Sequence, residues 1–259
     1  MNTSSKTYKL VLSAMLGAIV IVLGVTPLGF IPFGPMKLTI LHIPVIIGAI
    51  YGGPAVGMTV GLIFGIMSVF QAPGDITFGP VWATGEIKNY LLIGVTAIVP
   101  RILIGLTAAL TFKGAKKIPR KASLVGLGIV GAGMLAFSIW KLVEMISAGE
   151  SFYMYIILIA AIIGVSVWTA LTIGKRSISV VLAAGVGTLT NTILFLTLTY
   201  IFFGNLFAEL FETSRKAIAD ILVTAGITNG IPELVVSIVL ISAIAAAVKP
   251  KELKELSGH

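Results

Sequence analysis

The sequence contains no cysteine and only two histidines, His42 and His259, among its 259 residues. The lack of cysteine excludes disulfide bonds, thiolate nucleophiles and cysteine-based metal sites. Two histidines that are so far apart in the chain do not suggest a histidine cluster. We therefore expect neither a bound metal ion nor another cofactor.

Charged residues are also scarce. They make up 11% of the chain, 57% of the residues are hydrophobic, and the mean hydropathy is +1.08. A soluble domain usually carries about 25% charged residues. Apolar segments long enough to cross a bilayer recur along the chain, and in lipid such continuous segments have to be helices. The sequence therefore predicts an all-α membrane protein, with residues 1–259 in a single transmembrane domain.

The hydropathy pattern predicts about eight membrane spans. The second and third are short and are separated by Gly52–Pro54, which indicates a tight helical hairpin. Because Pro100-Arg101 interrupts the fourth span, we expect residues 72–97 to form a long outer loop. Residues 204–226 resemble an amphipathic outer helix, and the last span is expected to start at residue 230. The predicted spans are 10–28, 38–52, 54–70, 91–112, 123–145, 153–173, 178–203 and 230–248.

The distribution of positive charge predicts the orientation. Lysines and arginines gather near the two termini and in the segments 113–121 and 175–176, which account for twelve of the 18 basic residues. Positively charged loops favour the cytoplasmic side. We therefore expect a multi-pass protein of the cell membrane with both termini in the cytoplasm, whose first span is retained rather than cleaved as a signal peptide.

Two segments resemble nucleotide-binding motifs but lack the context that such motifs require. "GLGIVG" (126–131) has the dinucleotide-binding spacing, yet it lies inside an apolar span with no strand before it. Small residues there are better explained by close helix packing. "IGKRS" (173–177) has Arg176 where a phosphate-binding loop needs Ser or Thr. We therefore expect no ATP site, and we find no nucleophile–base pair that would indicate an enzyme.

Polar residues within or beside the spans are the candidate site. Ionisable groups in lipid usually face the protein interior or a cavity, because their burial is costly. In the predicted orientation most of these residues lie in the outer half of the membrane, and Asn191 lies near the middle of its span. We expect them to converge on an outward-facing cavity. The candidates are Lys37, His42, Arg101, Asn191, Asn229 and Glu233.

Each candidate also has a structural explanation. Glu233 follows Pro232, and this pair is typical of a helix start, where a carboxylate complements the helix dipole. Lys37 is long enough to extend its charged end to the membrane surface. His42 and Asn191 are also compatible with helix packing. These alternatives remain open at the level of the sequence.

Several blocks together resemble the substrate-binding (S) components of energy-coupling factor (ECF) vitamin transporters. They are the Ala14-x-x-x-Ala18 pattern, the segment 31–68, "VPRILIGLTAAL" (99–110), "GVGTLTNTILF" (185–195) and "IPELVV" (231–236). The resemblance covers roughly residues 8–112 and 178–248. It implies a six-helix core, with residues 122–175 as two extra transmembrane helices inserted between core helices four and five.

This resemblance implies a protein that captures a vitamin or vitamin precursor from outside the cell. Such components associate with a transmembrane coupling subunit and two ATPase subunits, and Ala14 and Ala18 would contact the coupling subunit. The blocks are most similar to pantothenate-type members, so a small carboxylate-bearing ligand is expected.

In this interpretation Arg101 pairs with the ligand carboxylate, and Asn191, Asn229 and Glu233 bond its hydroxyl or amide groups. Loops 28–38 and 71–97 would roof the cavity, and Trp82 would help to close it. The alternative is a stand-alone secondary transporter that is driven by protons, with Glu233 as the carrier.

Overall fold

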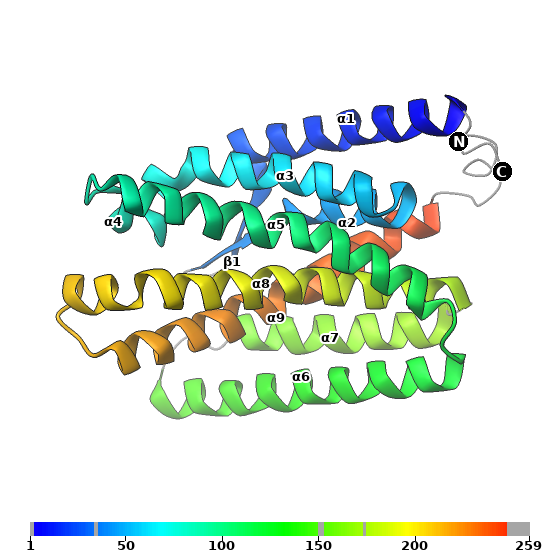
Figure 1. Ribbon diagram of the computed structural model, residues 1–259. Helices are drawn as coiled ribbons and strands as arrows, with labels where there is room; N and C mark the ends of the chain where they lie inside the picture. The colour runs from blue at the N-terminus through cyan, green and yellow to red at the C-terminus, as the bar shows by residue number, and fades with distance from the viewer. Residues whose placement is uncertain (1–2, 34–35, 150–152, 173–174, 248–259) are drawn as a thin grey trace.

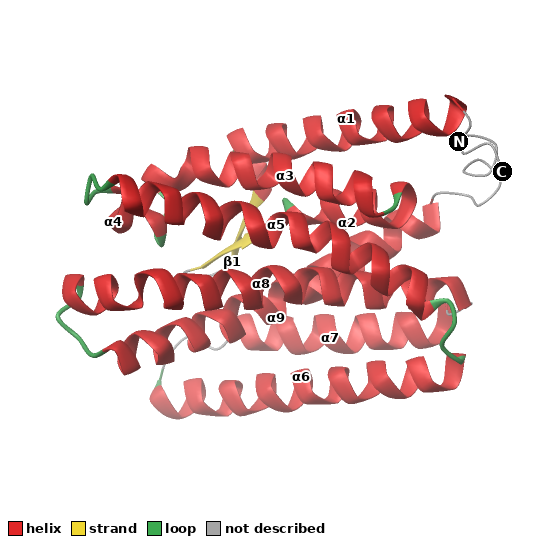
Figure 2. Ribbon diagram, in the orientation of Figure 1, coloured by secondary structure: helices red, strands yellow, loops and turns green. Residues whose placement is uncertain are grey.

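The computed structural model is a bundle of long helices that lie side by side (Figure 1). It describes residues 3–33, 36–149, 153–172 and 175–247. Helices dominate the described chain, and two short strands cross the bundle between them (Figure 2). The helices are α1 (Thr3–Val25), α2 (His42–Gly52), α3 (Pro54–Gln71), α4 (Phe78–Trp82), α5 (Ile87–Ala115), α6 (Arg120–Ala148), α7 (Tyr153–Thr172), α8 (Lys175–Leu210) and α9 (Arg215–Ala247). The strands are β1 (Phe30–Phe33) and β2 (Met36–Thr39), and two 3₁₀ turns occupy Pro27–Gly29 and Ala72–Gly74.

Six helices are long and apolar enough to cross a membrane, namely α1, α3, α5, α6, α8 and α9. The chain is therefore a multi-pass membrane protein, as its hydropathy predicts. The shorter apolar helices His42–Gly52 and Tyr155–Gly164 fall within the other two predicted spans. That these two also cross the membrane stays a prediction.

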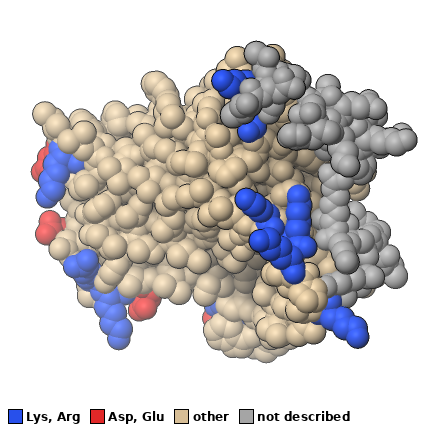
Figure 3. All heavy atoms as spheres, turned by 45° about the vertical axis from the view of Figure 1, so that its right-hand side comes forward, with Lys and Arg blue, Asp and Glu red and all other residues tan. Residues whose placement is uncertain are grey.

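On the face shown in Figure 3, charged side chains gather toward the two ends of the bundle, and a wide uncharged surface lies between them. At the end that we call the basic end, the α5–α6 turn exposes Lys113, Lys116, Lys117 and Lys121. The start of α1 and the end of α9 lie at this same end (Figure 1). The cytoplasmic location of the basic end stays a prediction.

Helices α3 and α5 approach each other closely along a row of glycines. Gly57, Gly61 and Gly65 recur every four residues and face α5. A Cβ atom at Gly61 would overlap the backbone carbonyl of Arg101, and one at Gly65 would lie 2.7 Å from the Cα atom of Ile98. Small residues at this spacing let two membrane helices pack backbone to backbone. The row therefore fixes the position of Arg101 against α3.

The prediction of a long loop over residues 72–97 is wrong for much of its length. The segment contains the short helix α4, and α5 already begins at Ile87. Pro100 lies inside α5 without ending it. A membrane helix tolerates proline because neighbouring groups and local adjustments satisfy the freed carbonyl, so a proline is a poor marker of a span boundary here.

Two other boundary predictions are also wrong. Residues 204–226 do not form one outer helix, because α8 ends at Leu210 and α9 begins at Arg215. The last helix therefore starts well before residue 230, with Pro232 inside it. Glu233 is not a helix-start residue.

The segment before α2 is a strand rather than the beginning of a membrane span. β1 and β2 pair antiparallel in the register Phe30 with Thr39 and Ile31 with Leu38. The all-helical prediction thus holds for the bundle but misses this hairpin, since four-residue strands produce no extended hydropathy signal.

The extra helices α6 and α7 pack on the bundle through a small apolar cluster of their own. Tyr155, Leu158 and Ile162 of α7 are buried together with Val235 of α9. The larger core lies between α1, α2, α3, α5, α8 and α9, as Val20, Ile46, Val60, Ile104 and Ile241 illustrate. That residues 122–175 are an insertion into a six-helix core stays a prediction.

Candidate functional site

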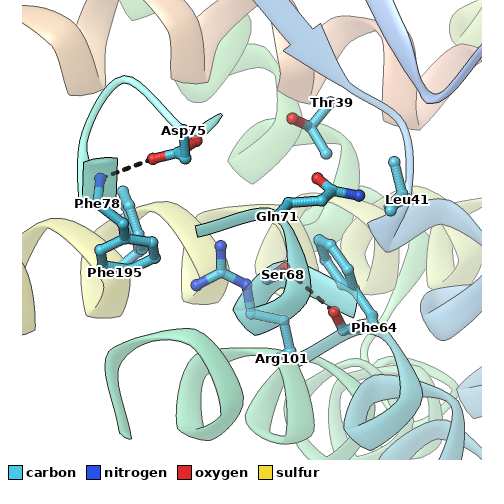
Figure 4. A pocket seen from close by; sticks show the side chains of 9 residues that line it. All are labelled: Thr39, Leu41, Phe64, Ser68, Gln71, Asp75, Phe78, Arg101 and Phe195. Carbon is cyan, nitrogen blue, oxygen red and sulfur yellow. Dashed lines mark hydrogen bonds between the residues drawn. The ribbon is translucent and has the colours of Figure 1, made fainter. Parts of the chain in front are cut away.

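A small cavity lies between the end of α3, the turn before α4 and the interiors of α5 and α8 (Figure 4). It encloses ≈ 70 Å³, which is room for several water molecules, since one needs about 10–15 Å³. Side chains from β2, α3, α4, α5 and α8 meet around it. The lining residues are Thr39, Leu41, Phe64, Ser68, Gln71, Asp75, Phe78, Arg101 and Phe195.

Arg101 is the cation of this cavity. Its side chain is only 8% exposed, and its Nη1 donates a hydrogen bond to the carbonyl of Thr96 at 3.0 Å. Its Nε is buried without a hydrogen-bond partner. The salt bridge within the described part of the chain joins Lys141 to Glu144. Arg101 therefore has no carboxylate within salt-bridge distance among the described residues. A buried charge is costly unless it is paired, and this arginine is therefore suited to bind an anion.

Two aromatic rings hold the guanidinium group. Its Cζ lies 4.8 Å from the ring centroid of Phe195 and 5.4 Å from that of Phe64. Aromatic faces attract cations at such distances. The rings orient the guanidinium without neutralising its charge, which leaves its remaining donors available to a ligand.

Two acidic residues act on Arg101 from a greater distance, Asp75 and Glu233. The Asp75 Oδ1 atom accepts hydrogen bonds from the backbone N–H groups of Thr77 and Phe78, at 2.8 and 2.9 Å. It thereby orders the turn that leads into α4. Its second oxygen makes no hydrogen bond within the described chain and is available to a donor in the cavity.

Two further polar residues of the lining have partners within the protein. The Gln71 Nε2 atom donates to the carbonyl of Gly24 at 2.6 Å, which joins the end of α3 to the end of α1. The Ser68 hydroxyl donates to the carbonyl of Phe64 at 3.1 Å.

Glu233 contacts the strand that borders the cavity. Its Oε1 atom accepts a hydrogen bond from the backbone N–H of Thr39 at 3.0 Å. The side chain is half-buried in the interior of α9. Glu233 itself does not line the cavity, but it bonds Thr39, which does. That Glu233 binds the ligand stays a prediction.

Three more predicted residues do not line the cavity but are close along the chain to lining residues or to Glu233. His42, 1% exposed, begins α2 directly after the lining residue Leu41. Asn191, 9% exposed, lies one helical turn before Phe195 on the same face of α8. Asn229 lies one turn before Glu233. The Oδ1 atoms of both asparagines are buried without a hydrogen-bond partner, and such atoms are favourable sites for a ligand donor.

The remaining predicted residues do not meet at the cavity. Trp82 packs against Tyr90, with ring centroids 4.5 Å apart, and Phe78 of the same helix takes the place at the lining. Lys37 lies in β2 opposite Pro32, but its side chain is outside the described part of the structure. Ala14 and Ala18 are exposed on α1.

Sequence reasoning missed most of the lining, including Ser68, Gln71 and Asp75. The spacing of these three residues places them on one side of the chain as α3 ends, and this polar stripe after an apolar run was a usable signal. Phe64 and Phe195 carry no such signal, because aromatic residues in membrane helices are ordinary.

The family described as "ECF transporter, substrate-specific component" matches residues 8–175, which is more than half of the chain. The chain belongs to this family. The resemblance noted in the sequence is thereby confirmed. As a substrate-specific component, the protein is a membrane component that binds a small-molecule substrate and is not itself an enzyme.

A curated relative is similar over most of its length. The chain is 26% identical over 224 residues to the "Pantothenic acid transporter PanT" of Lactococcus lactis subsp. cremoris (strain MG1363), covering 83% of this chain and 79% of the relative. The family match runs through residues 122–175. The α6–α7 hairpin of this S component therefore lies inside the matched region.

Proposed function

We propose that this S component captures pantothenate, or a similar small carboxylate-bearing vitamin or precursor, from outside the cell. The observation that supports this proposal is the buried guanidinium of Arg101, which borders the cavity without an ion-pair partner within the described chain. The name of the relative in Lactococcus lactis agrees with this ligand.

The chemistry of the site favours a ligand with one carboxylate and several neutral polar groups. A guanidinium binds a carboxylate through two parallel hydrogen bonds, which a lysine does not reproduce. The amide oxygens of Asn191 and Asn229 accept hydrogen bonds from hydroxyl or amide groups. Pantothenate carries one carboxylate, two hydroxyls and one amide, and therefore offers a partner to each of these groups.

The cavity has to enlarge to admit such a ligand. Sites for small molecules usually have volumes of about 300–1,000 Å³, whereas this partly open cavity has a volume of ≈ 70 Å³. The β1–β2 hairpin consists of two short strands among long helices (Figure 2), and Thr39 at its end lines the cavity. We expect the hairpin to move aside when the ligand enters.

Import is proposed to depend on an ECF coupling subunit and two ATPase subunits. The sequence lacks an ATP-binding motif of its own, and the small residues Ala14 and Ala18 are exposed on α1, where another membrane helix can approach closely. In this proposal the termini lie in the cytoplasm, the protein resides in the cell membrane, and the cavity opens to the outside.

The test is ligand-dependent thermal stability of the purified protein with pantothenate. A ligand at a hundredfold excess over Kd stabilises the folded state by about 2.7 kcal/mol. We expect a clear stabilisation of the parent protein, none for Arg101→Ala and a weakened one for Arg101→Lys. Arg215→Ala is the matched control, because Arg215 also stacks on a ring, that of Tyr200 at 4.9 Å, but does not line the cavity.

An unchanged pantothenate affinity in Arg101→Ala would refute the proposed role of Arg101. A parent protein that is folded but is not stabilised by pantothenate would refute the proposed ligand. The same assay with other carboxylated vitamins would then identify the substrate class.

A further inference from the structure

The hydrogen bond between Glu233 and Thr39 joins two parts of the chain that are 194 residues apart. Glu233 lies in α9, whereas Thr39 is the last residue of β2 and lines the cavity. This contact therefore connects α9 to the β1–β2 hairpin at the edge of the cavity.

The geometry of the hairpin leaves the Thr39 N–H free to make this bond. The next residue, Ile40, donates its N–H to the carbonyl of Gly29 at 3.1 Å. In an antiparallel pair successive N–H groups point alternately toward and away from the partner strand. The N–H of Thr39 therefore points away from β1, and the Glu233 carboxylate is its partner.

The carboxylate is presented by a firmly packed part of α9. Val235 is buried against α7, and Ser237 accepts a hydrogen bond from the Thr188 hydroxyl of α8 at 2.9 Å. Both residues lie within about one helical turn of Glu233. The helix is therefore held on two sides close to Glu233, so the carboxylate is presented from a fixed position.

We propose that Glu233 is a positioning residue that holds the β1–β2 hairpin over the cavity and so controls access of the ligand to Arg101. This role depends on the proposed function in one respect, namely that the cavity beside Arg101 is the site at which the ligand is captured. It differs from both sequence-based roles of Glu233, as a ligand contact and as a proton carrier, because its partner is a backbone N–H of the protein itself.

Opening of the hairpin requires this bond to break. Removal of the acceptor should increase the population of the open form, so that ligand enters and leaves faster. Glutamine at 233 keeps an oxygen that accepts the same bond, so Glu233→Gln should retain most of the closed form. Alanine cannot accept it. Proline at 39 removes the donor, and a proline is tolerated where a strand N–H points away from its partner.

The experiment uses the natural absence of cysteine. Ser68→Cys introduces a thiol of similar size into the cavity lining, and its reaction rate with a small anionic methanethiosulfonate reagent reports how often the cavity opens. In this background we expect Glu233→Ala and Thr39→Pro each to raise the rate about tenfold or more, the value expected for one lost hydrogen bond to a charged group. We expect Glu233→Gln to react at nearly the rate of the Ser68→Cys parent.

The double variant Glu233→Ala/Thr39→Pro should react no faster than the faster single variant, since both remove the same bond. Unchanged reactivity in folded Glu233→Ala would overturn the proposal, as would additive effects in the double variant. If Glu233→Ala does not fold, a faster reaction of Thr39→Pro together with a nearly parental rate of Glu233→Gln would support the proposal. An unchanged rate in Thr39→Pro would overturn it. No ligand is used, so failure of pantothenate to bind would refute the proposed function and leave this result intact.

Discussion

Gly61 of α3 lies directly against the backbone carbonyl of Arg101 in α5, so closely that a Cβ atom at residue 61 would overlap it. This contact is possible only because residue 61 has no side chain. It fixes how closely α5 approaches α3 at Arg101. The Arg101 guanidinium is thereby placed beside the ring of Phe64, which lies in the next turn of α3. The geometry of the cavity thus depends on a residue that does not line it.

We therefore expect Gly61→Ala to damage both stability and ligand binding. Overpacking in a close-packed interior typically costs about 1–3 kcal/mol, and separation of α3 from α5 would displace Arg101 from Phe64. The melting temperature and the pantothenate affinity should both fall. Gly126→Ala is the control, because nothing lies within 4 Å of a Cβ atom there. Equal behaviour of the two variants would contradict the role of the α3–α5 contact.

A substitution of Asn191 can distinguish a role in ligand binding from a role in helix packing. Its Oδ1 atom is buried without a partner, and replacement of an unsatisfied polar group by an apolar one of similar shape is nearly neutral or stabilising. We expect Asn191→Leu to melt at or above the temperature of the parent protein, yet to bind pantothenate about two- to tenfold more weakly, as for one lost hydrogen bond. The measurement is a thermal melt with and without ligand. A loss of stability with unchanged affinity would assign Asn191 to packing.

The hydrogen bond between Thr188 and Ser237 should contribute to stability without direct contact with the ligand. Ser237 is fully buried, and its distance to the Thr188 hydroxyl is 2.9 Å. Ser237→Ala should lower the free energy of unfolding by about 0.5–1.5 kcal/mol. The double variant with Thr188→Ala should show a non-additive effect. Additive losses would mean that the two hydroxyls do not stabilise each other.

Destabilisation of the α6–α7 hairpin should have little effect on ligand binding. Leu158 is buried in the cluster that joins α7 to Val235 of α9, and truncation of a buried leucine typically costs about 2–5 kcal/mol. Leu158→Ala should therefore increase hydrogen exchange in α7, while pantothenate affinity changes little. A large loss of affinity would show that the hairpin supports α9 at the binding site.

The energy source distinguishes the proposed function from the secondary-transport alternative. Proteoliposomes that contain this chain alone should not accumulate pantothenate when a proton gradient is imposed. Accumulation that requires Glu233 and collapses when the gradient is dissipated would favour the alternative. Co-reconstitution with a coupling subunit and its ATPases should give uptake that depends on ATP.

The helix segments were largely predictable from the sequence, because hydropathy is a local property and lipid permits little other than helices. All eight predicted spans contain a helix, although several ends are misplaced. The errors at residues 87–97 and 215–229 have one cause: proline and scattered charges were interpreted as boundaries, and α5 and α9 continue through Pro100 and Pro232.

The candidate site was predictable only in part. Arg101, Asn191 and Glu233 stood out, because polar groups in apolar segments are costly and therefore informative. Phe195, which holds the Arg101 guanidinium, did not stand out, since a phenylalanine in a membrane helix requires no explanation. The helix-start alternative for Glu233 is wrong, because Pro-Glu marks a helix start in many sequences but lies inside α9 here.

The sequence by itself determined that this is a helical membrane protein of the ECF substrate-specific family, with Arg101 as its candidate anion site. Composition, hydropathy and the order of its motifs are sufficient for those conclusions. Only the tertiary structure decided that Gly61 sets the position of Arg101, that two phenylalanines hold the guanidinium, and that Glu233 bonds the backbone of Thr39. Each of these contacts depends on the rotation and depth of one helix relative to another. Those quantities follow from side-chain packing over the whole bundle, and no local stretch of sequence contains them.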